Sequence, residues 1–94
     1  MKFEVKNSSG IETAICRVDG EDIGLPLAGS KTIRLEVGTH RIYLRVRGRP
    51  DKKWKVEYSS KGFALKPDDA RTVAAIAHDG GGWASARFTL KPRA

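Results

Sequence analysis

Apolar and polar residues alternate along two neighbouring segments of this chain, residues 32–37 and 40–47. Alternation with a period of two is typical of a β-strand that buries one face. Gly38 and Thr39 separate the segments, and a glycine in first position suits a two-residue type II′ hairpin turn. The pattern therefore predicts a β-hairpin over residues 32–47.

The predicted hairpin places similar or complementary residues opposite one another on each of its faces. Two aliphatic pairs lie on the inward face. A charge pair and a cation–π pair lie on the outward face, so both faces agree on one register. The inward pairs are Leu35–Ile42 and Ile33–Leu44, and the outward pairs are Glu36–Arg41 and Arg34–Tyr43.

A second hairpin is predicted around Asp19 and Gly20. Residues 12–18 alternate as a strand, Asp-Gly is a favoured type I′ turn, and residues 21–25 form a short return arm. This turn sets the register of the two arms. The expected register partners are Arg17 with Asp22, of opposite charge, and Cys16 with Ile23, both apolar.

Residues 71–78 are the ambiguous segment. Their alanine content favours a helix, for which Asp68 or Asp69 could serve as the N-cap. The run is short for a helix, however, and glycines at residues 80–82 end it before another alternating segment, residues 83–90. We therefore predict a strand over residues 71–78.

The alternating segments together predict an all-β fold. Turn residues separate about seven or eight short strands, which is typical of a single immunoglobulin-like antiparallel β-sandwich rather than an α/β fold. The chain has 94 residues with no linker or internal repeat, so residues 1–94 form one domain. Further strands are expected over residues 2–6 and 54–58, and residues 63–65 are expected to form a short strand or a bulge. The predicted core contains Val5, Cys16, Val18, Ile33, Leu35, Ile42, Leu44, Val46, Val56 and Phe88.

The composition adds a strong positive charge. Eighteen Lys and Arg residues against eleven Asp and Glu give a formal net charge of +7 at pH 7. This balance favours acidic partners such as nucleic acid, an anionic envelope polymer or lipid headgroups. No apolar run approaches the length that crosses a membrane. The charged start favours the cytoplasm if Met1 is the native first residue, and the oligomeric state stays open.

The residue types that enzymes and metal sites need are few and scattered. Cys16 is the single cysteine and lies in an apolar strand, so we expect a buried small hydrophobe and no internal disulfide. His40 and His78 lack a third ligand at metal-site spacing. No acid–base pair or nucleophile motif is present. We therefore predict a non-enzymatic protein without a metal or a cofactor.

The outward face of the predicted hairpin is the leading candidate binding site. Guanidinium groups around an aromatic ring can hold phosphates and stack a base, as in sheet-based nucleic-acid binders. The other interpretation is a solvated sheet face whose long side chains cover the ring and protect strand edges. The candidate residues are Arg34, Arg41, Tyr43, Arg45 and Arg47, with Lys53 and Lys55 from the next strand.

Trp83 follows a glycine-rich stretch, residues 79–82. That stretch could form a backbone nest for an anion, but a flexible turn is favoured because it lacks the residues of a phosphate loop. An exposed Trp83 could bind a flat ligand such as a sugar ring. The alternative is that Trp83 covers the open end of the core.

Three short segments resemble the PEGA family of small β-sandwich modules. They are Val18-Asp19-Gly20, Gly24-Leu25-Pro26-Leu27 and Leu35-Glu36-Val37-Gly38-Thr39-His40-Arg41-Ile42, within about the middle third of the chain. Val37 stands where the family usually has proline. The resemblance implies a non-catalytic accessory module with His40 as a packing and turn residue. It also implies a cell-envelope location if this is an excised domain.

The leading hypothesis is therefore a non-catalytic accessory or interaction module. It would bind a protein or an anionic polymer through a basic sheet face. One alternative is a small nucleic-acid-binding β-barrel, because the face combines cations with an aromatic ring. The other is a small carbohydrate-binding module that uses Trp83 or Trp54.

Overall fold

A computed structural model describes residues 1–66, 70–77 and 81–92. Within these ranges the chain is all-β and contains no helix, so no helix is long and apolar enough to cross a membrane. The strands are β1 (Lys2–Asn7), β2 (Ile11–Val18), β3 (Glu21–Asp22), β4 (Ser30–Thr32), β5 (Gly38–Gly48), β6 (Lys53–Ser59), β7 (Phe63–Lys66), β8 (Ala70–Ile76) and β9 (Gly82–Pro92).

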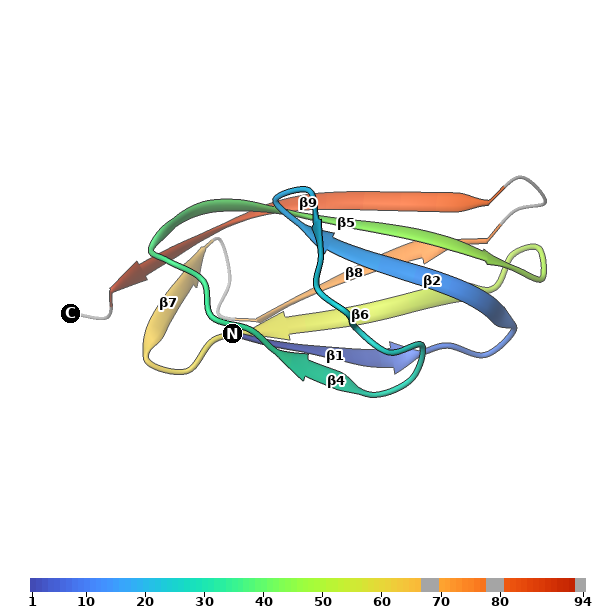
Figure 1. Ribbon diagram of the computed structural model, residues 1–94, viewed down its shortest axis with the longest axis horizontal. Helices are drawn as coiled ribbons and strands as arrows, with labels where there is room; N and C mark the ends of the chain where they lie inside the picture. The colour runs from blue at the N-terminus through green and yellow to red at the C-terminus, as the bar shows by residue number, and fades with distance from the viewer. Residues whose placement is uncertain (67–69, 78–80, 93–94) are drawn as a thin grey trace.

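The strands form two antiparallel sheets that pack face to face, which confirms the predicted β-sandwich (Figure 1). One sheet has the order β4-β1-β6-β8 and the other has the order β3-β2-β5-β9-β7. Most connections cross from one sheet to the other. The described part of the chain has nine strands, against about seven or eight predicted, and two of them, β3 and β4, are very short remnants of the arms predicted over residues 21–25 and 32–37.

The predicted hairpin over residues 32–47 is wrong. β4 ends at Thr32 and pairs with β1 in the four-stranded sheet, whereas β5 begins at Gly38 and pairs with β2 and β9 in the other sheet. Residues 33–37 cross between the sheets, so the hairpin pairs Glu36–Arg41 and Arg34–Tyr43 do not form. Ile33 and Leu35 of the crossing segment pack against the same core that Ile42 and Leu44 of β5 enter. Alternation identifies the buried face of a strand, but it does not identify the neighbouring strand.

Other local predictions are confirmed. Ile42 and Leu44 are fully buried. Asp19 and Gly20 have φ values of 54° and 86°, as a type I′ turn requires, and Arg17 is the register partner of Asp22. Arg17 and Asp22 nevertheless form no ion pair, and the Asp22 carboxylate accepts a hydrogen bond from the Gly24 N–H at 2.8 Å. Residues 71–76 of the ambiguous segment belong to a strand, β8, and residue 78 lies outside the described residues.

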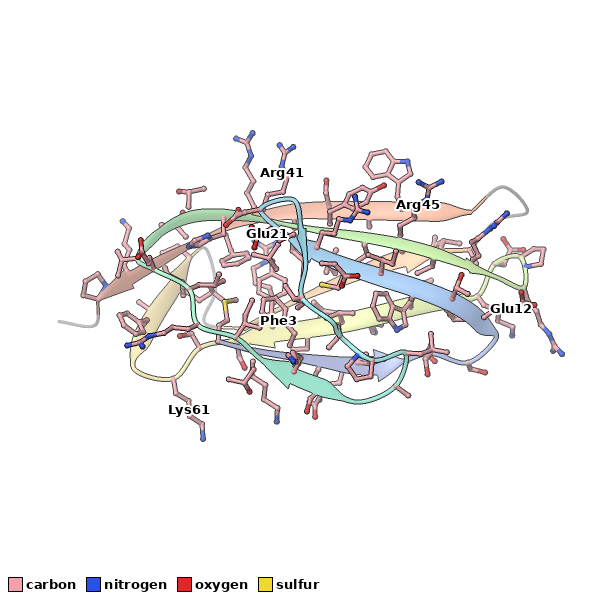
Figure 2. All side chains as sticks on the ribbon, in the orientation of Figure 1. Phe3, Glu12, Glu21, Arg41, Arg45 and Lys61 are labelled. Atoms are coloured by element: carbon pink, nitrogen blue, oxygen red, sulfur yellow. The ribbon has the colours of Figure 1, made fainter. Side chains whose placement is uncertain are left out.

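The core lies between the two sheets and contains most of the predicted residues. Cys16, Val18, Ile42, Leu44, Val46, Val56 and Phe88 are buried, while Val5, Ile33 and Leu35 are half-buried at its margin. The sequence prediction missed three large aromatic residues of the four-stranded sheet, Phe3, Trp54 and Tyr58. Phe3 lies between the layers in Figure 2. The Tyr58 ring joins the sheets because it packs 6.1 Å from the Phe3 ring and 5.0 Å from the Phe88 ring.

Candidate functional site

The structure divides the predicted site residues among three places. On β5, buried residues alternate with Arg41, Tyr43, Arg45 and Arg47, so these four side chains lie on the outer face of the five-stranded sheet. Trp83 on β9 lies beside them. Lys53 and Lys55 lie on β6, on the outer face of the opposite sheet, and Arg34 lies in the crossing segment. The single basic face expected from sequence is therefore wrong for Arg34, Lys53 and Lys55.

Strand pairing adds residues that sequence reasoning did not include. Arg17 on β2 and Arg87 on β9 are exposed and flank the outward residues of β5. Both alternate outward in strands that were predicted, but only the pairing places them beside β5. We call the outer surface formed by Arg17, Arg41, Tyr43, Arg45, Arg47, Trp83 and Arg87 the arginine face. The rows across it are Thr13–Arg47, Ile15–Arg45–Trp83, Arg17–Tyr43–Ser85 and Arg41–Arg87. Asp22 of β3 extends the third row beyond Arg17 at the edge of the sheet.

Tyr43 and Trp83 form a stacked pair on the arginine face. Their ring centroids lie 6.2 Å apart with 24° between the ring planes. Trp83 nevertheless keeps 67% of its surface exposed. Trp54, in contrast, is fully buried and its indole N–H donates to the Leu27 carbonyl at 3.0 Å. Of the two tryptophans, only Trp83 is accessible to a ligand.

A shallow groove of about 370 Å³ runs between the outward side chains of β2 and β5. Its walls combine three guanidinium groups with the Tyr43 ring and aliphatic surface. The exposed Ile15 belongs to the apolar part of this wall and lies in the same row as Trp83. The groove is lined by Thr13, Ala14, Ile15, Arg17, Tyr43, Arg45, Val46 and Arg47.

The two outer faces of the sandwich differ in charge balance. On the four-stranded sheet, Lys6 lies 2.7 Å from Glu4 and 3.8 Å from Glu57, and its hydrogen bond lowers the pKa of Glu4. On the five-stranded sheet, β5 and β9 contain no Asp or Glu, and the acidic residues Glu21 and Asp22 lie on the edge strand β3. Among the described residues, no arginine of the arginine face forms an ion pair. Figure 2 shows Arg41 and Arg45 pointing away from the sandwich on the same side.

His40, near the start of β5, connects this strand to the β2–β3 turn. Its Nδ1 lies 2.6 Å from Asp19 Oδ2 and its Nε2 lies 2.7 Å from the Glu36 carbonyl oxygen. Asp19 Oδ1 also accepts a hydrogen bond from the Arg41 N–H at 3.0 Å. The imidazole packs 5.5 Å from the Phe88 ring. These contacts give His40 a packing and turn role at the end of the sandwich, and we call this set of contacts the His40–Asp19 bridge.

The other polar candidates from the sequence provide no site in the described residues. His78, Asp79, Asp68 and Asp69 lie outside those residues, as does part of the glycine-rich stretch. Across the ranges that the structure describes, no group of three or more His, Cys, Asp or Glu residues could hold a metal ion.

Cys16 is fully buried in the core, and burial raises the pKa of its thiol to about 12, with a further contribution from the Asp22 carboxylate. Because the thiolate is the reactive form, we expect the folded protein to react with a disulfide reagent at about pH 8 on the order of a thousandfold more slowly than an unperturbed thiol. Absorbance of the released thiolate measures the rate. Protein unfolded in guanidinium is the control and should react rapidly. Equally fast reaction of the folded protein would contradict the buried placement.

Comparisons with known proteins identify no relative. No family model, no curated protein and no solved structure matches this chain. A functional proposal therefore rests on the geometry of the arginine face.

Proposed function

We propose that this protein is a non-catalytic binding module and that its ligand is an anionic polymer held on the arginine face. The observation that supports this most strongly is the placement of five arginines on three adjacent strands. All five lie on one side of the sandwich, around an aromatic pair formed by the half-buried Tyr43 and the exposed Trp83. Guanidinium groups bind phosphate and other oxyanions through two parallel hydrogen bonds, so such a surface suits repeated negative charges.

The shape of the arginine face favours a linear ligand over a compact acidic protein. Arg41, Arg45 and Arg47 follow one strand over about 20 Å, given the rise of an extended chain. Arg17 and Arg87 widen this row on the two neighbouring strands. A polymer lying along β5 would contact several arginines at once. An acidic protein is the alternative partner for the same charges, and it would need a matching curved or flat acidic surface.

We also propose that the module is PEGA-like within the broader immunoglobulin-like class. Its resembling segments meet in space, which supports this proposal. Asp19 belongs to the first segment and accepts hydrogen bonds from His40 and Arg41 of the third. Leu25 of the second segment is buried in the core. An accessory role without catalysis is consistent with such a module.

Charge reversal on the arginine face tests the proposed function. We expect Arg45→Glu/Arg47→Glu to weaken binding to a single-stranded oligonucleotide, to heparin or to polyphosphate by at least about tenfold, because two oxyanion contacts become repulsive. Fluorescence anisotropy of a labelled polymer measures the affinity. For an oligonucleotide, the slope of log K against log salt should also become shallower by about 1.4.

Lys53→Glu/Lys55→Glu is the matched control, because it produces the same net charge through exposed strand residues on the opposite sheet. Its affinity should stay close to that of the unaltered protein. An equal loss in both double variants would show that net charge alone governs binding and would overturn the site. Absence of binding to every polymer at low salt would overturn the function.

A further inference from the structure

We propose that the polymer on the arginine face is a single-stranded nucleic acid, with a base stacked on the Tyr43–Trp83 pair and phosphates held by the surrounding arginines. This inference rests on the proposed anionic-polymer function. It assigns separate roles to the two kinds of side chain on that face. The arginines would supply affinity for the backbone, and the aromatic pair would select a ligand with unpaired bases.

The aromatic pair has the properties of a stacking platform. Trp83 keeps two thirds of its surface in solvent although it already stacks on Tyr43. A large indole left exposed on a sheet face is costly in water, and covering it with a flat ring recovers that free energy. Stacking of bases on aromatic side chains is a main source of affinity in proteins that bind single strands.

The arginines lie on both sides of this platform. Arg45 is the register partner of Trp83, and Arg17 is the register partner of Tyr43. Arg47 lies two residues beyond Arg45 along β5. In the opposite direction, Arg41 and its register partner Arg87 lie two residues beyond Tyr43. Two residues span about 6.8 Å along a strand. A nucleotide whose base covers the aromatic pair would therefore have guanidinium groups near the phosphates that precede and follow it.

A double helix would contact the arginines of this face but not the aromatic pair. Its bases are stacked on one another and paired, so Trp83 would find no free base and only the arginines would make contact. Single strands can turn a base outward onto an aromatic residue, which is how sheet surfaces commonly bind RNA and DNA. The combination of an exposed indole with flanking arginines therefore favours the single strand.

A neutral sugar also fits less well than a nucleotide. Sugar hydroxyls need hydrogen-bond acceptors as well as an aromatic ring, and carboxylates commonly provide them. β5 and β9, which hold the aromatic pair, contain no Asp or Glu, and the carboxylate in the same row as Tyr43, that of Asp22, is two strands away on β3. The polar groups nearest the pair are mainly guanidinium donors, which match phosphate oxygens.

Two substitutions of Trp83 test the inference, because the side chain is two thirds exposed and we expect its replacement to have little effect on stability. We compare oligo(dT) and oligo(rU) of about 12 nucleotides, which is within the usual site size of single-strand binders. An abasic strand with the same number of phosphates, a duplex and a heparin fragment complete the ligand set. The affinity of the unaltered protein for the base-containing strands should exceed that for the abasic strand roughly tenfold.

Trp83→Leu should remove this preference and leave the affinity for the abasic strand unchanged, whereas Trp83→Phe should retain most of it. Binding should also quench the fluorescence of Trp83, which is distinguishable from that of the buried Trp54. Preference for oligo(rU) over oligo(dT), or the reverse, identifies RNA or DNA as the natural form of the ligand and supports the inference in either case.

Three results would overturn the inference while leaving the proposed function intact. They are equal affinity for the abasic and base-containing strands, tighter binding of the duplex, and tighter binding of heparin. Each must be accompanied by loss of binding in Arg45→Glu/Arg47→Glu. If no ligand of the set binds at low salt, both the inference and the proposed function fail.

Discussion

Replacing Trp54 by alanine is expected to reduce the free energy of unfolding by about 3–5 kcal/mol, enough to unfold much of the population of a small domain. The Trp54 side chain is completely buried between the sheets. Its indole N–H also holds the connection between β3 and β4 through the Leu27 carbonyl. The substitution therefore removes a large apolar volume and leaves that carbonyl without its partner.

Guanidinium denaturation followed by circular dichroism measures this loss, and Trp83→Ala is the matched control. The control variant removes the same kind of side chain from a position that is two thirds exposed. It should therefore reduce the free energy of unfolding by only about 0.5 kcal/mol. Similar losses in the two variants would contradict the assignment of Trp54 to the core and Trp83 to the surface.

Removing the Asp19 carboxylate should also reduce stability. Asp19→Ala is expected to cost about 2 kcal/mol, because hydrogen bonds to a charged group are lost and the Arg41 N–H and the His40 ring lose their acceptor. Asp19 also has a positive φ of 54°, a conformation that aspartate tolerates better than alanine. Thermal unfolding at about pH 6, which lies between the ordinary pKa values of Asp19 (3.8) and His40 (6.5), measures the change.

The same bridge gives the stability a defined dependence on pH. Burial of the ring lowers the pKa of His40, but hydrogen bonds to Asp19 and to the Glu36 carbonyl outweigh it, and the net shift is upward from 6.5. The His40 hydrogen bond lowers the pKa of Asp19 from 3.8. Both ring nitrogens face oxygen acceptors, so only the doubly protonated imidazolium donates to both.

The direction of each shift defines where the bridge is stabilising. The contribution of His40 is complete below pH 6.5 and is lost as the pH rises through its higher folded pKa. The contribution of Asp19 is complete above pH 3.8 and is lost as the pH falls through its lower folded pKa. The bridge is therefore strongest between these two values.

His40→Gln isolates this effect, because glutamine keeps a donor but does not titrate. The melting temperature of the unaltered protein should fall as the pH is raised from about 6 to 8, and this slope should shrink in the variant. A slope that persists unchanged in His40→Gln would assign the pH dependence to another group.

For the residues behind the functional proposal, the sequence predicted correctly which side chains point outward. It did not always predict which of them share a sheet. Arg41, Tyr43, Arg45 and Arg47 alternate with buried aliphatic residues, so their outward orientation was predictable. Lys53 and Lys55 also point outward, but from the opposite sheet, so they cannot share a ligand surface with β5. Arg17 and Arg87 take their place because β2 and β9 are the strands that pair with β5.

The wrong prediction of a hairpin at Gly38 has the same cause, because the local pattern does not show which strands pair. A glycine between two alternating segments satisfied every local requirement of a hairpin, and its φ of +139° is indeed one that glycine favours. The chain instead uses Gly38 at the start of β5, after crossing from the other sheet. The Asp19-Gly20 turn was predictable because its strands are adjacent in both sequence and space.

The sequence by itself determined the strand content, the inward and outward sides of most strands, the type I′ turn and the excess of positive charge. These properties depend on backbone preferences and on residues within one strand or turn. The tertiary structure decided which strands are neighbours, and with them the Tyr43–Trp83 stack, the membership of the arginine face and the burial of Trp54 rather than Trp83. These features depend on hydrogen bonds and packing between segments far apart in the chain, which are selected by burial of the whole core at once.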